Sequence, residues 1–247
     1  MFFLPLRDNV PSERPPVVNW LLILANIAAF AWMVHVCATP ADMKLFAERF
    51  GLVPDRVLTL VGRPRLLIEA PLPVLRDAVL PFASHMFVHG GLLHLIGNLW
   101  FLFIFGDNVE GRLGARRYVV FYFVCGILAA ALHIALTPHT WRGAPLPGFS
   151  SPLEVPMVGA SGAIAGVLGA YVVWFPRARV ATLLLIFVIQ VPAILFLGFW
   201  FVMQFLAAQE SLLLSDKMVF VAYWAHVGSF VVGAVLALLR PRRPAVA

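Results

Sequence analysis

Residues 159–169 of this 247-residue chain read GASGAIAGVLG. The glycines at positions 159, 162, 166 and 169 are spaced three, four and three apart, so a helix places them in one stripe. Such a stripe lets a second helix backbone approach closely, as helices do inside membranes. Ser161 lies beside the stripe, where a serine is most often part of the packing. The stretch therefore predicts a membrane helix packed tightly against another helix.

The composition of the whole chain also indicates a membrane protein. Hydrophobic residues make up 62% of it and charged residues 12%, and the mean hydropathy is +0.91. A soluble domain of this size would hold far more charge. We predict an all-α polytopic fold with a cytoplasmic segment at 1–16, one six-helix domain at 17–239 and a basic tail at 240–247. The candidate spans are 17–37, 92–105, 118–136, 158–175, 180–206 and 218–239.

Arginine and lysine near the span ends predict the orientation, because short basic segments stay on the cytoplasmic side. The side that we assign to the cytoplasm holds Arg7, Arg14, Arg112, Arg116, Arg117, Arg177, Arg179, Arg240, Arg242 and Arg243, whereas the short loops opposite hold Arg142 and Lys217. We expect both termini inside, in a bacterial plasma membrane or alternatively an organelle membrane. The net charge of +6 is then a topology signal and does not indicate a nucleic-acid surface.

The remaining segments carry weaker signals. The long first outer loop, at 38–82, holds several prolines between short apolar runs, so we expect it to be structured and partly embedded at the membrane interface. Cys37 and Cys125 lie within spans and cannot build a disulfide framework. Residues 1–4, MFFL, have no basic stretch before them, so we predict no cleaved signal peptide.

Three polar residues fall at one predicted depth. His94 precedes Asp107 by 13 residues, Ser161 precedes Phe175 by 14, and His226 precedes Arg240 by 14. Each separation is about 20 Å along a helix. In a hydrocarbon core about 30 Å thick, all three side chains would lie about 10 Å below the outer face. Polar side chains at such a depth are usually functional.

The sixth span carries a face that matches the glycine stripe. His226, Ser229, Gly233 and Ala237 recur at intervals of three, four and four, so small residues form one face with the histidine at its outer end. Packing this face against the glycine stripe would bring His226 to Ser161. The spacing alone is compatible with a functional pair and also with plain helix packing, because small and polar residues often serve only to pack membrane helices.

The second span adds His85, His89, His94 and Asn98. His94 and Asn98 share one helix face, whereas His85 and His89 would point to the opposite side of a continuous helix. Gly90 and Gly91 predict that the helix starts after them, which leaves His85 and His89 in the entering turn with a structural role. A zinc site stays open only if the chain folds back, and neither an HExxH nor a paired CxxC pattern supports one.

Together these motifs resemble those of the rhomboid intramembrane serine proteases. Gly159-Ala160-Ser161-Gly162 is similar to the family's GxSG, His94 to Asn98 to its HxxxN, and Ala225-His226 followed by Gly233 to its AHxxGxxxG. The resemblance covers all six spans, with the three motifs on spans two, four and six. It implies a six-helix rhomboid-like bundle that cleaves other transmembrane proteins.

The resemblance also implies residue roles. Ser161 would be the nucleophile and His226 the general base of a dyad without a carboxylate, with no cofactor or metal. His94 and Asn98 would stabilise the oxyanion together with the backbone N–H of the nucleophile. The chain departs from the family at Ser229, often glycine, and at Ala165, an aromatic residue in some members. We therefore expect the imidazole of His226 to be oriented by another side chain, with Tyr223 and Trp224 as the candidates.

The expected partners are transmembrane protein substrates and membrane lipid, with no nucleic acid. By resemblance, substrates enter past span five, along Gly198 and the bulky run 199–201, and water enters under a cap at 207–217, which contains Gln209, Glu210, Ser211, Ser215 and Asp216. The alternative is a rhomboid-like protein that binds membrane proteins for quality control without cleaving them. A third reading, a small transporter or cofactor-binding bundle, would need a polar path through the membrane, and the predicted spans contain almost no polar residues below the dyad.

Overall fold

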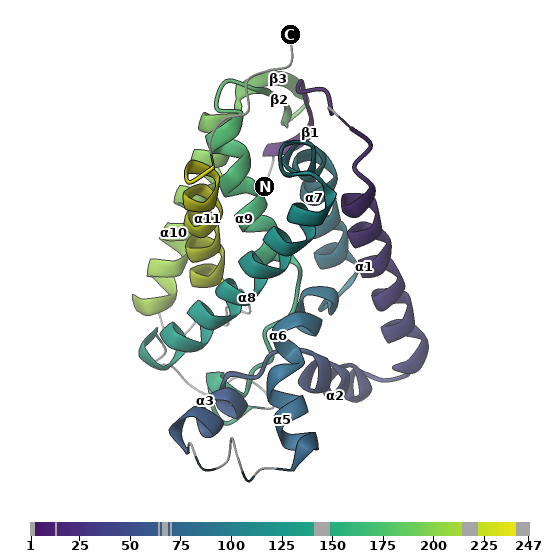
Figure 1. Cartoon of the computed structure of the whole chain (residues 1–247), viewed down its shortest axis with the longest axis vertical. Helices are drawn as coiled ribbons and strands as arrows, with labels where there is room; N and C mark the ends of the chain where they lie inside the picture. The colour runs from purple at the N-terminus through teal and green to yellow at the C-terminus, as the bar shows by residue number, and fades with distance from the viewer. Residues whose placement is uncertain are drawn as a thin grey trace.

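Six apolar helices form the body of the protein (Figure 1). They are α1 (Val17–Val36), α7 (Leu92–Leu113), α8 (Ala115–Thr140), α9 (Ser161–Trp174), α10 (Ala193–Leu213) and α11 (Tyr223–Leu238). The computed structural model describes residues 3–12, 14–63, 65, 69, 71–140, 149–213 and 222–240. By length and composition, α1, α7 and the Ala115–Leu136 part of α8 can cross a membrane, while α9, α11 and Ala193–Gln209 of α10 are shorter apolar helices.

The predicted fifth span is wrong over its first part. Residues 180–192 form most of a β-hairpin, with β2 at Arg179–Leu184 and β3 at Phe187–Pro192, and α10 starts only at Ala193. β1, at Phe3–Asp8, pairs antiparallel with β2, so the strand order is β1-β2-β3. The all-α prediction therefore needs correction. The apolar run is as long as a span, but it is rich in β-branched residues, and the N-terminal strand supplies a pairing edge.

The N-terminal segment is thus part of the folded unit. Trp100 on α7 donates its indole N–H to the carbonyl of Pro5, at 2.6 Å, and Tyr171 on α9 donates its hydroxyl hydrogen to Asp8. Both bonds attach β1 to the helices. The sheet lies at the same end of the molecule as the end of α9 (Figure 1).

The segment predicted as the first outer loop, 38–82, is structured over its described residues, as expected from the sequence. It contains the short helices α2 (Pro40–Phe50), α3 (Pro54–Gly62), α5 (Leu72–Val79) and α6 (Pro81–Ser84), followed by the 3-10 turn η1 (His85–Phe87). A second such turn, η2 (Pro152–Glu154), lies before α9. Prolines occupy the first turns of α2, α3, α5 and α6, where their missing N–H costs nothing.

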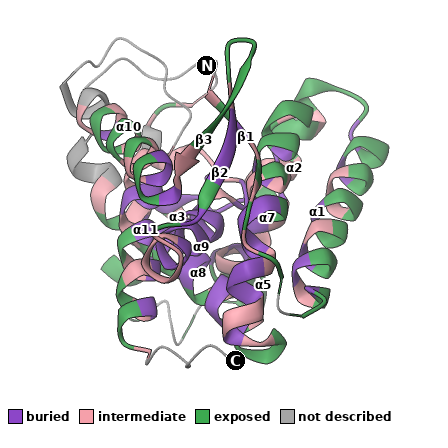
Figure 2. Cartoon of the chain, turned by 90° about the horizontal axis from the view of Figure 1, so that it is seen from above, coloured by how far each residue is buried: buried purple, intermediate pink, exposed green. Residues whose placement is uncertain are grey.

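α9 is the central helix and is buried from Gly162 to Tyr171 (Figure 2). Its 14 residues span about 21 Å, less than a hydrocarbon core. Neighbouring helices cover it, and glycines allow their close approach. A Cβ added at Gly169 would collide with the carbonyl of Phe230, and one at Gly233 with the carbonyl of Gly166. The predicted packing of span four against the small face of span six is confirmed for Gly166 and Gly169, whereas Gly159 lies before α9 and Gly162 faces Ala129 on α8.

Other span boundaries agree with the sequence to different degrees. α1 and the start of α7 match the prediction, whereas α7 runs eight residues past Phe105, to Leu113. Glu110 lies in this extension. Its carboxylate accepts the backbone N–H groups of Val18 and Asn19 at 3.0 and 2.7 Å, and so caps the N-terminus of α1 from α7. Residues 218–221 of the sixth predicted span and 241–247 of the predicted tail lie outside the described residues.

Candidate active site

Ser161 and His226 meet where α9 and α11 pack together. Ser161 is the first residue of α9, and His226 lies in the first turn of α11. The serine Oγ lies 2.6 Å from the imidazole Nε2, which is a short hydrogen bond. His226 is only 8% exposed. The two residues that the sequence placed at one depth are therefore in direct contact, 65 residues apart in the chain.

The chain enters α9 through a segment that is hydrogen-bonded to the stretch between α2 and α3. Leu52 and Met157 exchange two backbone hydrogen bonds of 2.9 and 2.8 Å. Gly159 then adopts a φ of +117°, in the left-handed region that favours glycine. This turn fixes where the backbone reaches Ser161.

His85 and His89 support the same segment and are fully buried. The backbone N–H of Gly159 donates to the carbonyl of His85 at 2.9 Å, and that of Ala160 to Nε2 of His89 at 3.5 Å. The His85 ring donates from Nδ1 to the carbonyl of Pro81 at 2.7 Å. Burial lowers the pKa of both imidazoles to about 4, so both are neutral at pH 7. Helix α7 starts at Leu92, after the two glycines, as predicted.

His94 lies beside the serine, and Asn98 follows one turn later on α7. A Cβ built on Gly159 would lie 2.8 Å from Nε2 of His94 and 3.7 Å from Oγ of Ser161, so the imidazole borders the space around the hydroxyl. His94 is exposed, while Asn98 is 7% exposed and donates from Nδ2 to the carbonyl of His94 at 2.9 Å. One amide hydrogen of Asn98 is therefore used within its own helix.

The sequence did not predict what holds the far side of the His226 ring. Nδ1 of His226 lies 2.8 Å from Oε1 of Gln204, on α10. Of the two candidates from the sequence, Tyr223 approaches the imidazole edge-on at 6.4 Å between ring centroids, whereas Trp224 packs against Phe205. The sequence does mark Gln204, because its amide is the one strongly polar group in the apolar run 199–206 and such a group inside a span is a functional candidate.

The two departures from the family pattern have simple structural outcomes. Ala165 is fully buried one turn after Ser161 and offers no ring to the imidazole of His226. The ring of Trp200 lies beside the imidazole instead, at 6.3 Å between ring centroids and tilted by 32°. Ser229 is also fully buried and donates to the carbonyl of Cys125 at 3.2 Å. Its hydroxyl is therefore satisfied, and the residue still allows close packing.

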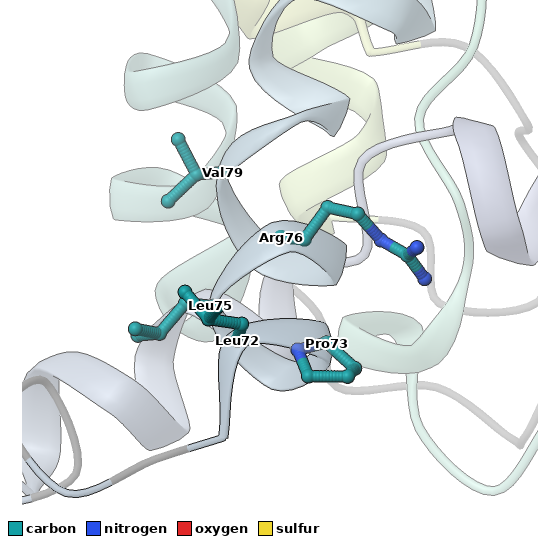
Figure 3. A pocket seen from close by; sticks show the side chains of 5 residues that line it. All are labelled: Leu72, Pro73, Leu75, Arg76 and Val79. Carbon is teal, nitrogen blue, oxygen red and sulfur yellow. The ribbon is translucent and has the colours of Figure 1, made fainter.

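Two other features lie apart from this site. An open hollow of about 450 Å³ is lined by Leu72, Pro73, Leu75, Arg76 and Val79, all on or at the start of α5 (Figure 3). None of these residues contributes to the surroundings of Ser161. Among the described residues, no group of three or more His, Cys, Asp or Glu side chains could hold a metal ion.

Comparison with known proteins identifies the family of the chain. The rhomboid domain matches residues 76–243, which is more than half of the chain. The chain belongs to the rhomboid family. RHOMBOID-like protein 5 of Arabidopsis thaliana is 28% identical over 181 residues, covering 65% of this chain and 53% of that relative. Presenilin-associated rhomboid-like protein A, mitochondrial, of Danio rerio is 25% identical over 113 residues, which cover 46% of this chain and 27% of that relative.

A third relative, RHOMBOID-like protein 1 of Arabidopsis thaliana, is 26% identical over 164 residues, which cover 61% of this chain and 38% of that protein. The matched part thus spans about half or less of the length of these relatives. Membership of the rhomboid family makes the chain a multi-pass membrane protein. The family includes serine proteases, which generally act on membrane protein substrates.

Proposed function

We propose that this protein is an intramembrane serine endopeptidase that cleaves transmembrane protein substrates. The observation that carries the proposal is the 2.6 Å contact between Oγ of Ser161 and Nε2 of His226, in a chain of the rhomboid family. A serine hydroxyl bonded to the imine nitrogen of a buried histidine is the arrangement that activates a nucleophile. In this proposal the bundle crosses the membrane six times, with both termini in the cytoplasm.

The reaction would follow the general course of serine hydrolases. Ser161 Oγ attacks the carbonyl carbon of the scissile peptide bond while His226 Nε2 takes its proton. His226 returns this proton to the leaving amine, which leaves an acyl-enzyme. Water then attacks the ester while His226 Nε2 takes its proton, the bond between the acyl carbon and Oγ breaks, and His226 returns this proton to Oγ, which releases the carboxylic acid. The first and last proton transfers pass directly between Oγ and Nε2.

His94 and Asn98 would stabilise the oxyanion of the tetrahedral intermediates. The imidazole of His94 borders the space beside the Ser161 hydroxyl, and Asn98 has a second amide hydrogen besides the one that it donates to its own helix. Both groups can donate a hydrogen bond without placing a charge in the membrane. Because His94 is exposed, water could reach the site along the surface that His94 shares with the Ser161 hydroxyl.

Substrates would approach past α10. The run 199–201 differs in its surroundings, since Phe199 is 48% exposed, whereas Trp200 lies against His226 and Phe201 against Phe230. A Cβ built on Gly198 meets no atom within 4 Å. The predicted cap at 207–217 is helical as far as Leu213, as part of α10, and 214–217 lie outside the described residues.

The first test is labelling of the purified protein by a fluorophosphonate probe, followed by cleavage of a reconstituted transmembrane substrate. We expect Ser161→Ala and His226→Ala to lose both activities. Matched controls are Ser229→Ala, a buried serine on α11, and His35→Ala, an exposed histidine on α1, which should keep both. A folded wild-type protein that is neither labelled nor active would favour the alternative of a non-proteolytic protein that binds membrane proteins.

A further inference from the structure

The hydrogen bond between His226 and Gln204 determines which ring nitrogen carries the proton. Oε1 of Gln204 lies 2.8 Å from Nδ1 of His226. A side-chain carbonyl oxygen accepts hydrogen bonds but cannot donate them, so Nδ1 carries the hydrogen. In a neutral imidazole the other nitrogen is then unprotonated, and that nitrogen is Nε2, 2.6 Å from the Ser161 hydroxyl. The contact selects the tautomer that can accept a proton from the serine.

Gln204 lies on the face of α10 that is turned toward α11. Residues on this face recur at intervals of three and four: Leu197, Trp200, Gln204 and Ala208. The first and last of them are fully buried, and the ring of Trp200 packs against both His226 and Phe230. An amide on the inward face of an apolar membrane helix needs a polar partner, and the oxygen of this one bonds to the imidazole.

We propose that Gln204 is a positioning residue for His226, whose amide oxygen fixes the tautomer and the ring orientation of the general base. The inference rests on the proposed function of the Ser161–His226 pair. When the proton moves from Oγ to Nε2, the ring becomes an imidazolium and keeps its Nδ1–H on the amide oxygen. The carbonyl dipole then stabilises the positive charge, without the cost of burying a carboxylate at this depth.

A packing role alone does not account for this geometry. A glutamine that only joins helices can bond to any backbone carbonyl or amide, whereas the oxygen of Gln204 bonds to a ring nitrogen of the candidate base. Tyr223 also lies near the ring, but its own ring stands at 90° to the imidazole and the described contact is aromatic. Gln204 is therefore the side chain with the geometry to fix Nδ1.

The test compares kcat and KM for a transmembrane substrate in three glutamine variants, two at Gln204 on α10 and one control on β3. Gln204→Leu removes the acceptor and should lower kcat by about 10-fold to 100-fold at unchanged KM, as expected for the loss of one partly buried hydrogen bond to a ring that becomes charged. Gln204→Glu keeps an acceptor oxygen at the same position and should restore most of the turnover, at a cost in stability from the carboxylate. Gln190→Leu replaces an exposed glutamine on β3, outside the site and the proposed substrate route, and as the matched control it should leave kcat unchanged.

A second measurement reads the tautomer in the wild-type protein and uses a variant only to assign the resonances. Imidazole ¹⁵N resonances of the wild-type protein, assigned to His226 by their loss in His226→Ala, should report hydrogen on Nδ1 and none on Nε2 at neutral pH. A ring protonated at Nε2 would overturn the proposal. So would an unchanged kcat in folded Gln204→Leu, an effect on KM alone, or a folded Gln204→Glu that stays as slow as the leucine variant.

The two proposals fail in distinguishable ways. If the wild-type protein neither reacts with a fluorophosphonate nor cleaves a substrate, the protease function fails, while the tautomer measurement still decides the contact. If the wild type is active and Gln204→Leu reacts with the probe as fast as the wild type does, the role of Gln204 is overturned and the Ser161–His226 dyad remains.

Discussion

Helix α11 is held by α9 and by α10 in different ways. Against α9 the backbones themselves touch, because Gly233 lies on the carbonyl of Gly166 and Gly169 on that of Phe230. Against α10 the contacts are made by side chains, chiefly Trp200 and Gln204 with His226. The glycine interface sets how closely the helices that carry the serine and the histidine approach each other. The α10 interface reaches the imidazole through side chains, on a helix whose other face is exposed.

The largest effect should come from breaking the glycine interface. Gly233→Val places a branched side chain onto the carbonyl of Gly166, so α9 and α11 must separate, at a cost of about 3 kcal/mol in unfolding free energy. Fluorophosphonate labelling should be lost together with stability, as followed by thermal unfolding in detergent.

The matched control for this change is Gly198→Val on α10, where an added Cβ meets nothing within 4 Å. Its unfolding midpoint should stay near that of the wild type. If both valine variants lost stability equally, the difference between the two interfaces of α11 would be refuted.

A smaller loss, confined to activity, should follow from removing a side-chain contact of the site. His94→Ala should lower turnover by about 10²–10³, the typical effect of deleting one oxyanion donor. Stability should change little, because His94 is exposed. Cleavage kinetics and unfolding are measured on the same preparations, with His35→Ala as the histidine control. Full turnover in His94→Ala would show that this imidazole serves packing only.

The smallest effect concerns the C-terminal end of α9, where Tyr171 is hydrogen-bonded to Asp8 of β1. Burial raises the pKa of the Asp8 carboxyl above its ordinary value, against the hydrogen bonds from Tyr171, Val10 and Asn108, which lower it. The folded state therefore holds the proton more tightly than the unfolded chain does. This contribution to stability is fully present below the unfolded pKa of 3.8 and is lost as the pH rises through the folded pKa.

Asp8→Asn removes this titration and keeps an oxygen that can accept from Tyr171. The stability of the wild type relative to the variant should decrease as the pH rises from about 4 to 7, by less than about 1 kcal/mol because the carboxyl is partly exposed. Thermal unfolding of both proteins across this range measures the difference. A wild-type advantage that grows with pH would contradict the expected sign.

Much of this architecture was predictable from local spacing. The glycine stripe of span four and the small face of span six predicted their own interface, since glycines three and four residues apart can only lie on one face of a helix. The paired glycines at 90 and 91 predicted the start of α7. Equal distances to the span ends placed Ser161 and His226 at one depth, and the structure brings them into contact.

The sheet was not predictable in the same way. The run from 180 to 192 is apolar enough for a span, and whether it becomes helix or hairpin depends on a pairing edge from β1, more than 170 residues earlier in the chain. The end of α7 is a similar case, because Glu110 stays helical while its carboxylate caps α1. Such contacts depend on partners that are distant in sequence, so no local pattern signals them.

The sequence by itself determined that the chain is a membrane protein, which helices pack by glycine, and which serine and histidine share a depth, because composition and helical periodicity are local properties. Only the tertiary structure decided that Gln204, from a third helix, holds the far side of the imidazole. Glutamine has no strong spacing signature, and its role depends on how α10 is rotated against α11, which is set by the packing of the whole bundle.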